Sequence, residues 1–317
     1  MKELLIDDFF RAMKGEWQEG FEVRYRPILE ELLQLLSADL KEGDIERFFH
    51  GKNRFVCEKF IKYFMKYAKL SWRNKKKIKK LLSFLSSQEI TSRDYDERIE
   101  ALGVNHAIKA YWEPEDEVDK RRIDIISDAI DAKRGEVIID VGCGVGTFTY
   151  RTALKGAMAI GVDYSLQSLR VAKFLAEKRL GGDDWIGFVV ADATNLPFKD
   201  SSVDVIVSAD FIEHIDDSQK EIFLDESARL LNKNGRMVIF TPNKIRESIG
   251  AIVRWFRGGE GTRLHLGLTS RFSFEKKLRK RGLRYRRRFI DVVRPYLADL
   301  TIFNELLALE ILWVIKR

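Results

Sequence analysis

The stretch from Val137 to Thr149, VIIDVGCGVGTFT, decides the fold of this chain. It opens with an apolar, β-branched run that is typical of a buried parallel strand. Glycines follow at three alternate positions, and we expect a helix to begin near Thr147. Glycine can adopt positive φ and lets a ligand touch bare peptide groups. A strand, a glycine-rich loop and a helix N-terminus together predict a nucleotide-binding crevice at the carboxyl edge of a sheet.

The spacing of the glycines distinguishes two kinds of nucleotide site. The dinucleotide fingerprint G-x-G-x-x-G requires its third glycine where this chain has Thr147. The pattern that starts at Asp140 is instead Asp-x-Gly-x-Gly-x-Gly. This pattern resembles motif I of the class I S-adenosylmethionine (SAM)-dependent methyltransferases. A glycine-rich loop alone is a weak signal, so the interpretation depends on the residues that follow.

An acidic residue ends the second predicted strand, 158–162. Asp163 lies 19 residues after Gly144, where a carboxylate can accept hydrogen bonds from the ribose hydroxyls of a bound nucleoside. Its alternative role is the N-cap of the next helix. The following residue, Tyr164, is a candidate to pack on the adenine through its backbone or ring.

The segment after the third predicted strand carries the second part of the resemblance. It reads Asp192-Ala193-Thr194-Asn195-Leu196-Pro197-Phe198. In the family this segment contacts the adenine through an aspartate carboxylate and the next peptide NH, which here are those of Asp192 and Ala193. The resemblance thus implies a cofactor site formed by Asp140, Gly142, Cys143, Gly144, Gly146, Asp163, Tyr164, Asp192, Ala193 and Ser208.

The loop after the predicted strand 203–207 lines the substrate pocket in the family. Here it reads Ser208-Ala209-Asp210-Phe211-Ile212-Glu213-His214. Asp210 is a candidate substrate contact. His214 is a candidate general base because an ordinary imidazole titrates near neutral pH. Alternatively, the Glu-His pair orients the loop or caps the next helix. The Asn-Pro-Pro-Tyr signature of amine-directed nucleic-acid methyltransferases is absent at this point of the sequence.

From residue 137 onward predicted strands and helices alternate, which predicts an α/β fold with right-handed crossovers. The resemblance implies a Rossmann-like, seven-stranded methyltransferase sheet in which the last strand, near 311–315, runs antiparallel. We therefore assign residues 105–317 to a methyltransferase domain. A helix at 105–131 is expected before the first strand. Tyr111 and Trp112, near its start, are either substrate contacts or packing residues.

Residues 244–272 belong to no predicted element of the sheet. Their glycines and aromatic residues are typical of a mobile insert that covers a substrate. His265, within this insert, is either a substrate contact or a residue that packs the loop.

Two segments concentrate positive charge on the chain. Residues 1–104 predict an all-helical N-terminal domain, in which residues 52–80 hold twelve Lys or Arg against one acid, Glu58. Residues 276–288 hold nine Lys or Arg and no acid. Such segments favour an anionic partner, namely RNA, an anionic small molecule or an anionic membrane surface. The alternative is a pair of solvated faces that bind nothing.

Composition excludes several other classes of protein. The cysteines, Cys57 and Cys143, are too few for a disulfide framework or a Cys-based metal site. No stretch of 18 apolar residues occurs and the N-terminus is acidic, so neither a membrane span nor a signal peptide is expected. We expect a cytoplasmic protein with no bound metal.

Together these patterns predict a SAM-dependent methyltransferase whose acceptor is a small molecule or a lipid-like anionic compound. The sequence leaves open whether the acceptor atom is O, C or N. It also leaves open two alternatives, an RNA methyltransferase that uses both basic segments and a non-catalytic SAM-binding module. Positioning of the acceptor and exclusion of water can supply much of the rate of such a transfer.

Overall fold

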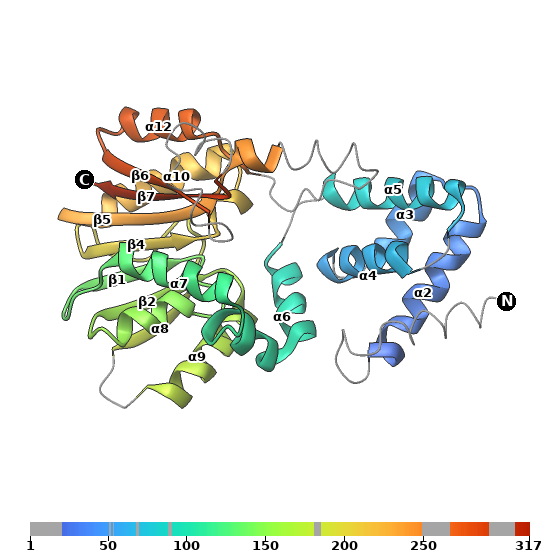
Figure 1. The fold of residues 1–317 in the computed structure, drawn as a ribbon, viewed down its shortest axis with the longest axis horizontal. Helices are drawn as coiled ribbons and strands as arrows, with labels where there is room; N and C mark the ends of the chain where they lie inside the picture. The colour runs from blue at the N-terminus through green and yellow to red at the C-terminus, as the bar shows by residue number, and fades with distance from the viewer. Residues whose placement is uncertain are drawn as a thin grey trace. The chain divides into compact units, whose positions relative to one another are not determined.

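The computed structural model describes residues 21–50, 52, 54–67, 70–87, 91–180, 185–248, 267–291 and 308–317. The chain divides into two compact units, residues 1–103 and 104–317, and each is described by itself (Figure 1). The predicted helix near 296–308 falls mostly outside the described residues, as does His265.

The first unit is helical, as its periodicity predicts. Its described helices are α2 (Phe21–Ser37), α3 (Glu42–Phe49), α4 (Arg54–Tyr67), α5 (Trp72–Ser87) and the first part of α6 (Ser92–Ala107). Fully buried side chains from α2, α4 and α5, among them Leu32, Phe60 and Leu81, form its core. Part of its basic segment is used internally, since Lys62 pairs with Glu58 and Lys52 pairs with Glu31.

A seven-stranded sheet forms the second unit, and this confirms the predicted fold class. The strand order is β3-β2-β1-β4-β5-β7-β6, and only the pairs that involve β7 are antiparallel. The strands are β1 (Val137–Val141), β2 (Met158–Asp163), β3 (Ile186–Val190), β4 (Val203–Ala209), β5 (Leu231–Pro242), β6 (Arg284–Ile290) and β7 (Glu310–Lys316).

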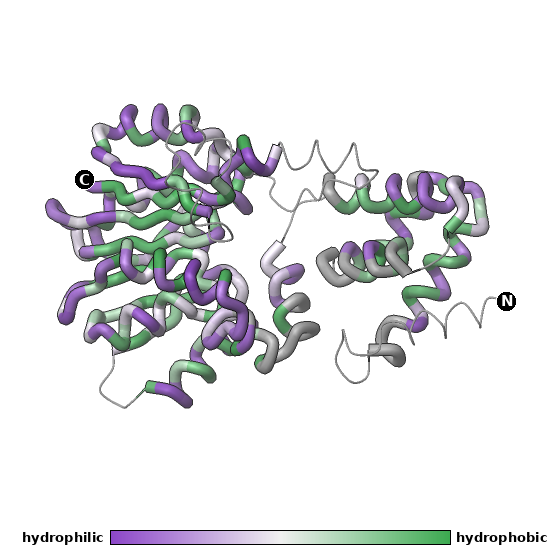
Figure 2. The backbone as a smooth tube through the Cα atoms, in the orientation of Figure 1, coloured by the Kyte–Doolittle hydropathy of each residue, from purple (hydrophilic) through white to green (hydrophobic). Residues whose placement is uncertain are grey.

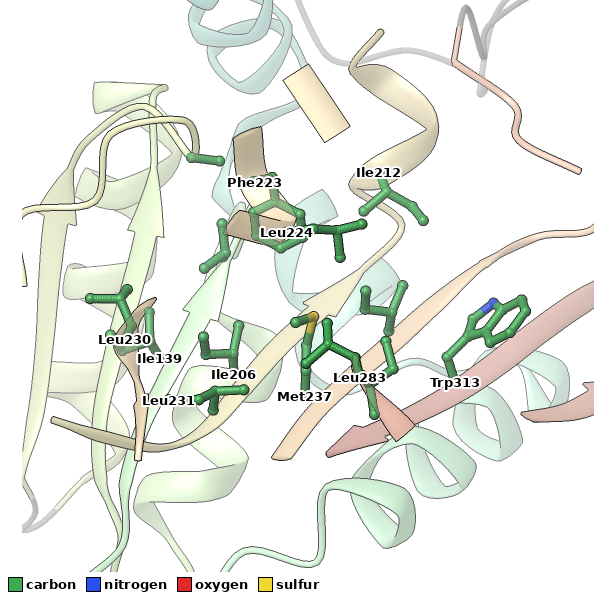
Figure 3. Close-up of a cluster of buried hydrophobic side chains, with 14 of the residues drawn as sticks. Ile139, Ile206, Ile212, Phe223, Leu224, Leu230, Leu231, Met237, Leu283 and Trp313 are labelled. Carbon is green, nitrogen blue, oxygen red and sulfur yellow. The ribbon is translucent and has the colours of Figure 1, made fainter. Parts of the chain in front are cut away.

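Helices bury both faces of this sheet because its central strands have buried apolar side chains on both sides. Figure 2 shows these strands as mostly hydrophobic along their length. One face packs against α7 (Glu117–Ile130) and α8 (Thr147–Ala153). The other face packs against α10 (Asp217–Leu230) and α12 (Arg271–Lys280). On this second face Ile206, Met237 and Trp313 come from successive strands, with Phe223 and Leu224 of α10 beside them (Figure 3). Helix α9 (Leu166–Arg179) connects β2 to β3.

The chain before β1 differs from the single helix predicted at 105–131. Helix α6 ends at Ala107, a short π-helical turn follows at Ile108–Trp112, and α7 begins only at Glu117. Pro114 separates the two segments, as expected of a residue that lacks an amide proton. The carboxylate of Asp116 caps α7 by accepting the amide protons of Val118 and Asp119. The prediction missed this break, and Tyr111 and Trp112 therefore lie in the π-helical turn that precedes α7.

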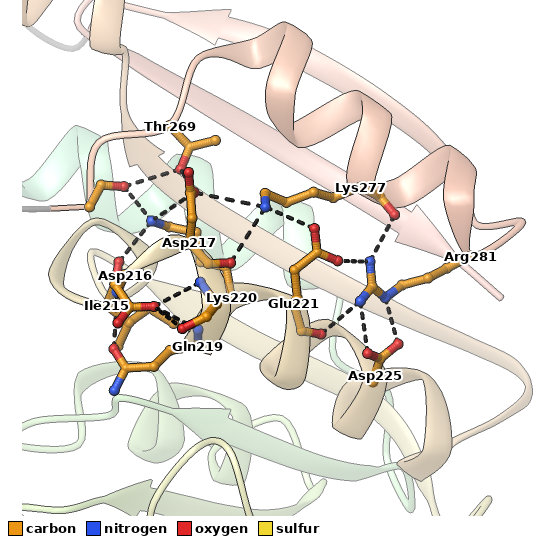
Figure 4. Close-up of polar contacts among 12 residues, drawn as sticks. Ile215, Asp216, Asp217, Gln219, Lys220, Glu221, Asp225, Thr269, Lys277 and Arg281 are labelled. Atoms are coloured by element: carbon orange, nitrogen blue, oxygen red, sulfur yellow. Dashed lines mark hydrogen bonds and ion pairs between the residues drawn. The ribbon is translucent and has the colours of Figure 1, made fainter.

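Charge neutralisation within the domain changes the interpretation of the basic run 276–288. Lys277 of α12 pairs with Glu221 of α10, and Arg281 pairs with Asp225 (Figure 4). Arg287 of β6 pairs with the buried Glu275. These pairs join α10, α12 and β6 to one another. Three exposed arginines of the run, Arg284, Arg286 and Arg288, lie on the edge strand β6, where charge discourages edge-to-edge pairing with another sheet.

Within the described part of the chain, no helix is both long and apolar enough to cross a bilayer.

Candidate functional site at the carboxyl edge of the sheet

The loop between β1 and α8 is held in shape by its three glycines, which all adopt the left-handed backbone conformation. Their φ angles are 72° at Gly142, 52° at Gly144 and 82° at Gly146. The backbone amides of Gly142 and Cys143 both donate to the carbonyl oxygen of Val162, with N···O distances of 2.8 and 3.1 Å. These bonds fix the loop over the end of β2, at the carboxyl edge of the sheet.

The space around the glycines differs from one to the next. A Cβ atom on Gly142 would lie 2.5 Å from the ring of Phe211, and one on Gly146 would lie 3.0 Å from Ala172. A Cβ atom on Gly144 would have no heavy atom within 4 Å. The loop is therefore packed at its two ends and open at its middle. Open peptide at Gly144 fits a loop that receives a ligand.

Asp140 lies beneath this loop and is only 2% exposed. Its carboxylate accepts hydrogen bonds from the amide and hydroxyl of Thr149, at 3.0 and 2.8 Å. Burial raises the pKa of Asp140 to about 7, although the bonds from Thr149 oppose this rise. The geometry thus assigns Asp140 to the junction of β1 and α8, and direct contact with a cofactor stays a prediction.

Asp163 joins the glycine loop to the end of β2. One carboxylate oxygen accepts the amide proton of Gly144 at 2.8 Å, and the other accepts that of Ser165 at 2.9 Å. The cap of α9 is the hydroxyl of Ser165, which accepts from Ser168, so the alternative role for Asp163 as the N-cap is wrong. Beside it, Tyr164 is 39% exposed, and its contact with the adenine stays a prediction.

The loop after β3 lies next to Asp163, because β2 and β3 are paired in parallel up to Asp163 and Val190. The exposed Asp192 accepts the amide and hydroxyl protons of Thr194, at 2.8 and 2.7 Å. Ala193 is 8% exposed. The structure therefore gathers the glycine loop and the two predicted strand-end carboxylates along one side of the sheet edge.

Trp112 does not line an open pocket, as a substrate contact would. Its side chain is 2% exposed, its indole NH donates to the carbonyl of Val145 at 2.6 Å, and its ring stacks on Tyr150 at 4.4 Å. The half-buried Tyr111 supports the same loop, since its carbonyl accepts the hydroxyl proton of Thr147 at 3.1 Å. For Trp112 the packing alternative fits the geometry, and it buttresses the glycine loop from outside.

We therefore expect Trp112→Phe to destabilise the domain and to weaken SAM binding together. The variant keeps an aromatic ring but leaves the carbonyl of Val145 without its donor, which costs about 1–3 kcal/mol of unfolding free energy. Denaturant unfolding and calorimetric SAM titration measure the two effects. A variant with unchanged stability and unchanged SAM affinity would contradict the buttress role and return Trp112 to the substrate side.

The other side of the sheet edge, at β4 and β5, carries a different set of polar groups. Ser208 is fully buried and its hydroxyl has no hydrogen-bond partner in the described structure. Asp210 has a φ of 52° and forms an ion pair with Arg122 of α7. Glu213 is 1% exposed and accepts the hydroxyl proton of Thr241 at 3.0 Å. Phe211 joins the two sides because its ring packs against Gly142.

The loop that carries Glu213 is tied to the chain around Gly267 by a buried lysine. The ammonium of Lys220 donates to the carbonyl of Ile215 at 2.7 Å and to that of Gly267 (Figure 4). The amide of Gly267 in turn donates to the carbonyl of Glu213 at 2.9 Å. Burial lowers the pKa of Lys220. The end of the predicted insert is thus anchored to the candidate site.

Sequence reasoning missed two members of this side, Arg122 and Glu310. Arg122 lies within an ordinary amphipathic helix, and Glu310 lies at the start of the last strand, so neither belongs to a motif. His214 was predicted, and the structure places it in a single 3₁₀ turn, Ile212–His214, directly after Asp210 and Phe211. Its role as a general base stays a prediction.

Comparison with known proteins agrees with this geometry. Residues 139–239 match the family model described as a methyltransferase domain. A demethylmenaquinone methyltransferase of Clavibacter sepedonicus is 39% identical over 105 residues, which are 33% of this chain and 40% of that protein. A ubiquinone biosynthesis O-methyltransferase of Pelagibacter ubique is 36% identical over 125 residues, which are 37% of this chain and 50% of that protein. The chain thus spans half or less of the length of these relatives.

Among solved structures, the magnesium protoporphyrin IX methyltransferase of Synechocystis with bound SAH superposes with a TM-score of 0.53. It is 17% identical in sequence, and the match covers 71% of this chain and 99% of that one. Identity at this level shows a shared fold. The sheet, the glycine loop and the family match therefore point to the same class of protein.

Proposed function

We propose that this chain, whose residues 139–239 belong to the methyltransferase-domain family of class I SAM-dependent enzymes, transfers a methyl group from SAM to a small-molecule acceptor. The observation that carries the proposal is the open peptide at Gly144, with the Asp163 carboxylate bonded to its amide. A ligand that combines a ribose with a compact polar tail fits this arrangement, because the carboxylate and the bare peptide lie side by side.

The residues present fit SAM at the β1–β2–β3 side of the sheet edge. The peptide at Gly144 would face the amino-acid portion, Asp163 the ribose hydroxyls, and Asp192 with Ala193 the adenine. When bound, SAM supplies an electrophilic methyl group on a sulfonium. The chain holds this loop rigid through Asp140 and Trp112, so that the acceptor can be positioned against a fixed donor.

A quinone-type or similar ring compound is the acceptor class that we propose. This proposal is supported by two of the relatives named above, which are a demethylmenaquinone methyltransferase and a ubiquinone biosynthesis O-methyltransferase. The RNA alternative is weaker, because several of the cations between Lys276 and Arg288 are engaged by Glu221, Asp225 and Glu275. Both an enzyme and a non-catalytic module would bind SAM, so only a measurement of methyl transfer distinguishes these two alternatives.

Two measurements on the full chain test the proposal. Isothermal calorimetry should show SAM and SAH binding. Incubation with methyl-tritiated SAM and a cell extract, fractionated into organic-soluble, RNA and protein parts, should place label in the organic-soluble fraction. Label in RNA would favour the second alternative, and tight SAM binding with no label in any fraction would favour the non-catalytic one.

A further inference from the structure

Four charged side chains meet on the β4–β5–β7 side of the sheet edge, which the SAM assignment leaves unused. This Arg122 cluster consists of Arg122, Asp210, Glu213 and Glu310. The guanidinium of Arg122 lies over the ring of Phe240 at 5.2 Å, pairs with Asp210, and interacts electrostatically with Glu213 and Glu310. Asp119, on the same helix as Arg122, adds a fourth carboxylate to those that interact with this cation.

Two carboxylate oxygens of this cluster are buried without a hydrogen bond from any group in the described structure. They are Oε1 of Glu213, a residue that is 1% exposed, and Oε2 of Glu310. A buried acceptor without a donor costs free energy, so an orphaned pair at a candidate site indicates a missing hydrogen-bond donor. Ser208, fully buried on β4, adds a third polar group without a partner in the same described region.

Glu310 reaches this edge because β7 runs antiparallel to its neighbours. Its register partners are Pro242, the last residue of β5, and Ile290, the last residue of β6. The first residue of an antiparallel strand therefore lies at the carboxyl ends of the parallel ones. This is the edge at which ligands bind in open α/β sheets.

The surroundings of Glu310 favour a carboxyl group that can exchange its proton near neutrality. Burial raises the pKa of Glu310 to about 7, the Arg122 guanidinium opposes the rise, and Asp291 and Glu247 add to it. These groups face Glu310 from α7, from the end of β6 and from the segment after β5. Unlike Glu213 and Asp291, Glu310 is only half-buried and so can return a proton to solvent.

We propose that the methyl acceptor enters the Arg122 cluster as a neutral hydrogen-bond donor, a phenol-type hydroxyl, and that Glu310 takes its proton. This inference rests on the proposed function. The hydroxyl oxygen gains the methyl group while its proton passes to the carboxylate of Glu310. The donor leaves as the neutral thioether, keeping the electron pair of the broken carbon–sulfur bond, so atoms and charge balance.

The charge of the cluster also selects among acceptors. The carboxylates of Asp210, Glu213 and Glu310, with those of Asp119 and Asp291 near them, outnumber the two nearby cations, Arg122 and Lys220. An anionic acceptor group would meet this excess of carboxylates at close range, whereas a hydroxyl would supply the missing donor. The cluster therefore favours a neutral acceptor group over the anionic one that the basic segments led us to expect.

The test compares wild type with Glu310→Gln, Glu310→Asp and His214→Ala, each as the full chain with tritiated SAM and the organic-soluble extract. Glu310→Gln should bind SAM as tightly as wild type and transfer label about 10²–10⁴-fold more slowly, the usual contribution of a general base. The wild-type rate should rise with pH through about 7, because the ionised carboxylate is the active form. That limb should be absent in Glu310→Gln and present in Glu310→Asp.

A purely structural role for Glu310 predicts a different pattern. If Glu310 mainly neutralised Arg122, Glu310→Gln would lower the melting temperature most at high pH. The raised pKa predicts the opposite sign, since the carboxyl favours the folded state when protonated and this contribution is lost as pH rises toward about 7. The difference in melting temperature, Glu310→Gln minus wild type, should therefore become more positive as the pH rises from 5 to 8.5.

Three results would overturn the inference while leaving the proposed function intact. The first is a wild-type rate in Glu310→Gln. The second is loss of the pH-dependent rise in rate in His214→Ala but not in Glu310→Gln. The third is that the anionic naphthalene-1,4-dicarboxylate inhibits transfer as strongly as the neutral 1,4-dihydroxynaphthalene, or more strongly. If wild type itself transfers no label, the proposed function fails and this inference fails with it.

Discussion

Gly144→Ala is expected to reduce SAM affinity by more than 100-fold while the protein stays folded. The added methyl group would occupy the open space above the peptide, where no heavy atom lies within 4 Å. Its cost to the fold is limited to the positive φ of 52°, which for a non-glycine residue is about 1–2 kcal/mol. Calorimetric titration with SAM and thermal unfolding measure the two quantities separately.

Gly142→Ala is the matched control, because it adds the same methyl group two residues earlier in the same loop. There the new Cβ would overlap the ring of Phe211, with atoms at 2.5 and 2.7 Å, at a φ of 72°. Overpacking and backbone strain together cost several kcal/mol, so this variant should lose stability and binding together. If Gly144→Ala bound SAM as tightly as wild type, the peptide at Gly144 would not be the one that contacts SAM.

The second large effect is expected for Asp163→Ala, which should lower SAM affinity by about 100-fold or more. Removal of the carboxylate leaves ribose hydroxyls without acceptors, and each hydrogen bond to a charged group contributes about 1.5–3 kcal/mol. It also frees the amide of Gly144, so the loop should loosen. We expect a folded protein whose melting temperature falls by a few degrees, as measured by calorimetry.

Asp163→Asn separates these two contributions. The amide side chain keeps one oxygen acceptor, which can still receive a proton from Ser165 or from Gly144, but it loses the charge and the second acceptor. Its SAM affinity should fall between those of wild type and Asp163→Ala, with a smaller change in melting temperature. Unchanged calorimetric binding in both variants would remove Asp163 from the cofactor site.

The part of the fold that could be predicted from sequence is the part that local patterns encode. The strands predicted at 158–162 and 203–207 correspond to β2, Met158–Asp163, and β4, Val203–Ala209, because short apolar runs mark buried strands locally. Helix 105–131 was predicted as continuous because its apolar spacing is helical on both sides of Pro114. The proline breaks it, and the cap at Asp116 restarts it.

Prediction of the candidate site was uneven for the same reason. Asp163 and Gly144 form a motif whose 19-residue spacing reflects one strand and one helix, so their contact was foreseeable. No comparable sequence pattern indicates that Trp112 is buried. Whether an aromatic side chain faces a pocket or packs behind a loop depends on the partners that the fold brings to it, here Val145 and Tyr150.

The sequence by itself determined the sheet, the glycine loop and the carboxylates on its cofactor side, because each follows from residues that are close along the chain. Only the tertiary structure decided which charged side chains surround the predicted loop of Asp210 and Glu213. Arg122 and Glu310 are far apart in the sequence, and they interact electrostatically because β7 inserts antiparallel between β5 and β6. No local pattern encodes that insertion, since its register depends on contacts across the whole sheet.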